Sequence, residues 1–102
     1  MNQPEINEEN LRAHFREEVG PVKWKELERF FAGGTVIEVD KSLDLVDVAV
    51  HVTLDNASRV KEWMDSGFVR RIEDEVAIRL NEENATVTGV VSRPWVFIQI
   101  GE

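Results

Sequence analysis

Apolar residues recur at helical spacing in the first third of the chain. From residue 11 to residue 19 they fall every four positions, after an asparagine, Asn7, whose side chain can cap a helix. A wider apolar face begins near residue 22 or 25 and continues to residue 32. Gly20-Pro21 and Gly33-Gly34 follow these segments, and both are sequences that end helices. The pattern therefore predicts two short helices.

The next segments alternate in the manner of strands. Residues 35–39 form one candidate strand, and residues 44–53 form a longer one with a valine at every second position. The connection at 40–42 is short enough for a hairpin, so we expect the two strands to pair in antiparallel fashion. Four valines of the longer strand share one face and should pack on the core: Val46, Val48, Val50 and Val52.

The second half of the chain predicts two helices and three strands. A helix follows residues 55 and 56, a short strand covers residues 68–72, and another helix begins at Asp74. Residues 86–91 and 95–100 complete the strands. The predicted order is α-α-β-β-α-β-α-β-β, in a single domain over residues 1–102 whose first six residues form a frayed N-terminus.

This order predicts an α+β fold. Hairpins dominate it, so we expect a mixed or largely antiparallel sheet of about five strands, with helices packed mainly on one face. The strand at 95–100 is apolar on both faces, which is typical of a strand covered on both sides. Four short helices are too few to cover both faces of such a sheet, so one apolar face needs another cover.

An apolar face left uncovered within one chain marks an interface. We therefore predict that Leu45, Ala49, Trp95 and Phe97 contribute to a contact with a second copy of the chain or with another protein.

Charge and composition remove several classes of partner. The 102 residues carry 20 acidic and 12 basic side chains, a formal net charge of −8, without the basic face that nucleic acids and anionic membranes require. There is no cysteine, no signal-peptide pattern and no apolar run near the roughly 20 residues of a membrane span. We therefore expect a cytoplasmic protein that binds neither nucleic acid nor membranes.

Candidate chemistry is sparse. Asp47 and His51 are the strongest polar pair, but residues four apart on a strand lie about 13 Å apart, beyond hydrogen-bond reach. The simpler interpretation is that both residues lie on the more solvent-exposed face of a half-buried strand. With Arg93 they define the alternative, a polar site for a small molecule or a modest enzyme. His14 and His51 are the two histidines of the chain, so we expect neither a metal site nor a cofactor.

Several stretches of the sequence resemble one family in order and spacing. They are WKELERFFAGG at 24–34, DKSLDLVDVA at 40–49, the segment 60–67 and PWVFIQ at 94–99. These resemble the DUF2288 family of small bacterial proteins, a domain of unknown function, over nearly the whole chain after residue 10. The resemblance implies a bacterial, single-domain protein and brings no activity, cofactor or catalytic residue with it. Family members tend to carry a small or capping residue where this chain has Lys25, which concerns where the second helix begins.

Two functions follow from these observations. The sequence contains no recognisable set of catalytic residues, and the strand 95–100 is apolar on both faces. These two observations favour a non-catalytic protein-interaction or regulatory module, as a homodimer or with another protein. The alternative is small-molecule binding around Asp47, His51 and Arg93. The deciding structural question is what covers the second face of the strand 95–100.

Overall fold

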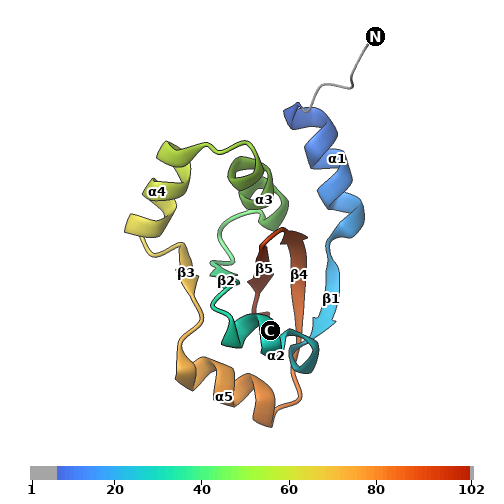
Figure 1. Ribbon diagram of the computed structural model, residues 1–102, viewed down its shortest axis with the longest axis vertical. Coiled ribbons are helices and arrows are strands. Elements are labelled where there is room, and N and C mark those ends of the chain that lie inside the picture. The colour runs from blue at the N-terminus through green and yellow to red at the C-terminus, as the bar shows by residue number, and fades with distance from the viewer. Residues whose placement is uncertain (1–6, 102) are drawn as a thin grey trace.

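The fold combines helices and strands along the whole described chain. The computed structural model describes residues 7–101, which form five helices and five strands (Figure 1). The predicted frayed segment 1–6 lies outside the described residues. The elements are α1 (Glu8–Glu18), β1 (Gly20–Lys23), α2 (Trp24–Ala32), β2 (Val36–Val39), α3 (Leu45–Thr53), α4 (Ala57–Asp65), β3 (Val69–Arg71), α5 (Asp74–Glu82), β4 (Thr86–Ser92) and β5 (Trp95–Gln99).

The five strands form one open, mixed sheet in the order β1-β4-β5-β2-β3. β5 lies at its centre, antiparallel to β4 and parallel to β2. β1 and β3 form the two edges, each antiparallel to its neighbour. The predicted fold class, an α+β domain with a mixed sheet of about five strands, is confirmed. Within the described part of the chain no helix is long and apolar enough to cross a bilayer.

Helices cover both faces of this sheet, so the prediction that they pack mainly on one face is wrong. α1, α3 and α4 lie on one face, and α2 and α5 lie on the other. The prediction failed because α2 and α5 pack on the opposite side of the sheet, and α3, a helix that the sequence did not predict, adds to the cover of the first side. The alternation of β5 distributes its residues between the two cores, Phe97 to one and Val96 and Ile98 to the other.

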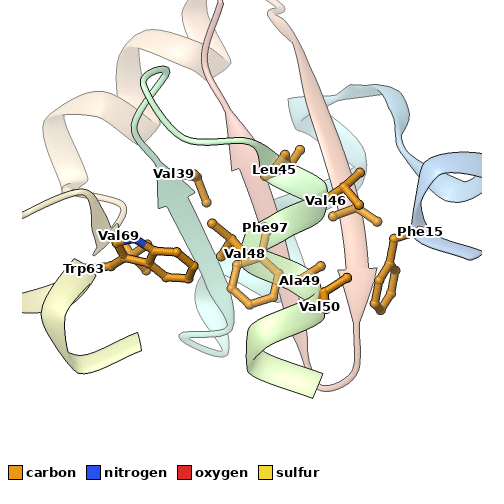
Figure 2. Packing of buried hydrophobic residues seen from close by; sticks show 11 residues of the cluster. Phe15, Val39, Leu45, Val46, Val48, Ala49, Val50, Trp63, Val69 and Phe97 are labelled. Carbon is orange, nitrogen blue, oxygen red and sulfur yellow. The ribbon is translucent and has the colours of Figure 1, made fainter. Parts of the chain in front are cut away.

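We call the first core the α3-side core. Figure 2 shows α3 crossing the sheet with Val48 and Ala49 beside Phe97. Its buried members are Phe15, Val39, Leu45, Val46, Val48, Ala49, Val50, Trp63, Val69, Val90 and Phe97.

We call the second core the α5-side core. Its buried members are Trp24, Leu27, Val36, Ile72, Ala77, Leu80, Val87, Val96 and Ile98. Trp24 and Phe31 of α2 contact each other there, with ring centroids 5.5 Å apart. The two cores together answer the question posed by the strand at 95–100, because this chain covers both of its faces.

The segment 44–53 is a helix, and the predicted long strand and its hairpin are therefore wrong. Asp44 caps α3, since its carboxylate accepts hydrogen bonds from the backbone N–H groups of Val46 (2.9 Å) and Asp47 (3.4 Å). Five of the nine residues of α3 are buried, and a helix that is apolar almost all round belongs in a core. Burial between α1, α4 and the sheet thus overrides the strand propensity of its valines.

A second difference from the predicted order is β1, which the sequence did not reveal. Gly20-Pro21 ends α1 as expected, but the chain then pairs with β4 for four residues before α2 begins. The N–H of Trp24 donates to the carbonyl of Ala85, and in an antiparallel pair every second residue bonds the neighbouring strand. Pro21 lies at one of the alternate positions, so its backbone nitrogen faces away from β4. Pro21 lacks an N–H, so it blunts this open edge of the sheet.

Candidate functional site

The predicted polar pair lies on α3, where helical geometry brings it together. Residues four apart in a helix share a face, and His51 Nε2 lies 3.5 Å from Asp47 Oδ1. The expected separation of about 13 Å applied to a strand, so it is wrong along with the strand.

Asp47 also holds α1 against α3. The guanidinium of Arg12 on α1 donates to Asp47 Oδ1 at 2.9 Å and to Glu8 Oε2 at 2.7 Å. Hydrogen bonds to Glu8 and to Asp47 raise the pKa of Arg12, whose charge is therefore fixed at every accessible pH. The ion pair joins two elements of the fold through Asp47 Oδ1.

His51 is likewise engaged by its own chain. The Asn56 side-chain amide lies 3.0 Å from Nδ1, and Nε2 faces Asp47. The imidazole packs edge-to-face with Trp63, with ring centroids 5.6 Å apart. These contacts with Asn56 and Trp63 make His51 a structural link between α3 and α4.

The structure does not bring Arg93 to this pair. Arg93 is exposed in the turn between β4 and β5, and its side chain makes no hydrogen bond or ion pair with the described residues. The contact between this turn and α3 is made instead by Ser92, whose Oγ lies 2.7 Å from Thr53 Oγ1. The three residues of the predicted polar site therefore form no shared site in this structure.

The aspartates at the end of β2 and the start of α3 have local roles. Asp40 Oδ2 accepts hydrogen bonds from the Ser42 hydroxyl (2.7 Å) and the Ser42 N–H (3.0 Å), and these bonds lower the pKa of Asp40. Asp44 is the cap of α3. Across residues 7–101 no three His, Asp or Glu side chains gather in a way that would hold a metal ion.

The predicted interface residues are mostly core residues. Leu45, Ala49 and Phe97 have exposed fractions of 4%, 0% and 2%, so they cannot form an exposed contact surface. The prediction is wrong for these three because it placed them on a sheet face that α3 itself covers. Trp95 differs, since it is half-buried and packs at the margin of the α3-side core.

Trp95 lines an apolar pocket between α4 and the sheet that the sequence did not predict. We call it the α4 pocket; its volume is about 210 Å³. Val52 of α3 and Val60 and Met64 of α4 form one wall. The complete lining is Ile37, Val52, Val60, Met64, Val69, Arg70, Arg71, Trp95 and Phe97. The pocket is thus an open extension of the α3-side core.

The pocket continues into a shallow hollow along α4. Val52, Val60 and Met64 line both, and the hollow extends past Asn56 to Asp65. Met64 has 60% of its surface exposed, the largest exposed fraction among the described large hydrophobic residues. A flexible methionine at an open apolar site is suited to packing against varied partners.

Comparison with known proteins places the chain in a family. A family model described as "Protein of unknown function (DUF2288)" matches residues 10–100. The chain belongs to the DUF2288 family. This confirms the resemblance seen in the sequence. No curated protein matches this DUF2288 chain.

A solved structure shows the same fold for a relative of this DUF2288 protein. The chain is similar to PA1075 from Pseudomonas aeruginosa, whose solution structure was determined by NMR. The two share 34% sequence identity and superpose with a TM-score of 0.79, over 91% of this chain and 86% of the other. The overall fold of this chain is therefore shared with a solved structure of a protein 34% identical to it.

One signal in the sequence indicated part of this site. Trp95 stood out because both faces of its strand are apolar, and it does line the α4 pocket. The spacing of Val60 and Met64 is typical of an apolar stripe on one face of a helix, and nothing in it shows that a pocket forms beside that stripe. Pocket formation depends on the angle between α4 and β3, which helical periodicity does not encode.

Proposed function

We propose that this DUF2288 protein is a non-catalytic protein-interaction module of the cytoplasm, and that the α4 pocket is its contact surface. The observation that carries the proposal is the exposure of Met64 beside an apolar pocket whose floor continues into the core. Exposed apolar surface next to a preformed hollow is typical of a site that binds another molecule.

The state of the polar residues supports a non-catalytic role. Asp47 forms an ion pair with Arg12, His51 contacts Asn56, and no hydrogen bond or ion pair joins Arg93 to either of them. A catalytic site needs groups that converge on one point where a substrate can react, and no such contact brings these three side chains together.

The charge of the chain favours a different protein over a second copy. Two chains that each carry a formal net charge of −8 repel one another, which weakens self-association unless the contact is large. The rim of the pocket, in contrast, carries Arg70 and Arg71. We therefore propose a heterologous protein partner.

Site-specific photo-crosslinking tests this proposal. A benzoylphenylalanine placed at Met64 is expected to give one discrete adduct with a different protein in cells of the native host. The same probe at Ile78, which is 57% exposed on α5, is the matched control and should give none. Val52→Phe fills the pocket and should abolish the adduct at position 64, while circular dichroism confirms the fold.

Two results would contradict the proposal. Equal adducts from positions 64 and 78 would show that the chain is captured without use of the pocket. An adduct of twice the chain mass would replace the heterologous partner with a second copy.

A further inference from the structure

We infer that the α4 pocket recognises an apolar side chain lying next to a carboxylate in a polypeptide partner, with Arg71 binding the carboxylate. This inference rests on the proposed function and specifies the chemistry of the partner. It draws on the size of the pocket, the ionic state of Arg71 and the charge of the whole chain.

The size of the pocket fits one side chain. Its volume of about 210 Å³ exceeds the ~150 Å³ of an apolar cavity that takes up benzene, and is below the roughly 300 Å³ at which pockets for larger ligands begin. The lining is aliphatic and aromatic on every side except the arginine rim. A phenyl ring or a leucine-sized side chain therefore fits the pocket.

The two arginines at the rim differ in their ionic partners. Arg70 is engaged within the chain, donating to Glu38 Oε2 at 3.0 Å and to the Gly67 carbonyl at 2.6 Å. Arg71 is exposed, and its guanidinium makes no ion pair with residues 7–101. An unpaired guanidinium at the mouth of an apolar pocket is a ready partner for a carboxylate, which it binds with two parallel hydrogen bonds.

The position of Arg71 is fixed by the sheet. Arg71 pairs with Ile37 across the β2–β3 ladder, and both side chains lie on the α3 side with Val69. Its Nη1 lies beside Gly34, at 3.7 Å from where a Cβ on that glycine would stand. The sheet therefore places Arg71 opposite Ile37, and its side chain lines the pocket.

The charge around the pocket selects a single carboxylate over a polyanion. Lys61 on α4 forms an ion pair with Asp65, with Nζ and Oδ2 2.8 Å apart. A single unpaired guanidinium at the rim of this pocket attracts one carboxylate at short range, whereas a phosphate backbone is repelled by the formal net charge of −8 on the chain. An acidic side chain next to an apolar one satisfies both parts of the site.

Titration with short peptides, followed by ¹H–¹⁵N NMR, tests the inference. The probes are the acetylated and amidated peptides SGFEGS and SGEFGS, with matched peptides in which the glutamate is glutamine or the phenylalanine is alanine. We expect at least one phenylalanine–glutamate peptide to shift the amide signals of Val60, Met64 and Arg71. The glutamine version should bind roughly tenfold more weakly, since a hydrogen-bonded charge is lost. The alanine version should lose at least about tenfold in affinity, since the pocket stays empty.

Variants separate Arg71 from the rest of the surface. Arg71→Gln should reduce affinity for the glutamate peptide to that of the glutamine peptide. Arg79→Gln on α5 is the matched control, because Arg79 is also exposed without an ion pair to the described residues, and it should change nothing. Both positions are exposed, so both variants keep the fold.

The outcomes are distinguishable from those of the crosslinking experiment. If position 64 gives its adduct but the glutamate and glutamine peptides bind equally, the inference fails and the proposed function stands. If 3-phenylpropionate binds as tightly as the better peptide, the site recognises free acids and the polypeptide partner is wrong. If no peptide binds and no adduct forms, both proposals fail.

Discussion

The two faces of the sheet carry cores that differ in how far they are closed. In the α5-side core Trp24, Leu80 and Ile98 have exposed fractions of 2%, 2% and 0%, and the hollow on the outer surface of α2 is lined by charged residues. The α3-side core is equally dense around Val48 but opens at α4, where Trp95 is half-buried and Met64 is exposed. The comparison teaches that one sheet can carry a core that serves stability and a core that also offers an apolar binding surface.

The largest effect should come from the closed core. Trp24→Ala removes a ring that is almost fully buried and should lower the free energy of unfolding by about 3–5 kcal/mol. Trp95→Ala at the pocket is the matched change and should cost less than half as much, because the ring is already part-exposed and its loss opens no sealed cavity. Urea denaturation measures both, and equal losses would contradict the difference between the cores.

The next effect concerns the helix on the open side. Asp44→Ala removes the cap of α3 and should lower the free energy of unfolding by about 1 kcal/mol, with Asp44→Asn retaining most of it. Thermal unfolding followed by circular dichroism measures the loss. If Asp44→Ala leaves stability unchanged, the Asp44 cap does not stabilise α3.

A smaller effect is expected from the ion pair between Arg12 and Asp47, which joins α1 to α3. A double-mutant cycle with Arg12→Gln and Asp47→Asn should give a coupling of about 0.2–1 kcal/mol, because both side chains are partly exposed to water. The coupling should fall as salt is raised from low to physiological ionic strength. A coupling of zero at low salt would mean that apolar contacts alone hold α1 in place.

The smallest effect is the pH response of the turn that leads from β2 into α3. Hydrogen bonds from Ser42 hold the pKa of Asp40 below its ordinary value of 3.8, so this contribution to stability is present above that pH and is lost as pH falls through the lowered pKa. Ser42→Ala removes the hydroxyl bond and should raise the pKa of Asp40, which carboxyl NMR titration measures directly. An unchanged pKa would show that the Ser42 hydroxyl does not act on this carboxylate.

Local sequence signals predicted the elements that rest on local physics. Asn7 caps α1 through a 2.8 Å hydrogen bond to the N–H of Asn10, and Gly34 and Gly67 take φ of +79° after α2 and α4. These features, and the strands β2, β4 and β5, depend on side chains within a few residues of one another. They were therefore visible without tertiary information.

The segment 45–53 could not be assigned from its valines alone. Alternating valines indicate a strand, yet Asp47 and His51 are also four apart, which suits a helix with one polar face. The choice is made by tertiary contact, because α1 supplies Arg12 and the sheet supplies Phe97. The candidate site likewise depends on tertiary contact. The sequence indicated that Trp95 lies at an apolar surface, but it did not indicate the pocket that Trp95 lines.

Methyl NMR with a neutral apolar probe tests the central claim most directly. Benzene, at its solubility limit in water, should shift the methyl signals of Met64, Val60 and Ile37 at the α4 pocket and leave those of Leu80 and Ile98 in the α5-side core unchanged. Shifts of similar size in both cores, or no shift at the pocket, would contradict the claim that only the α3-side core is open to a ligand.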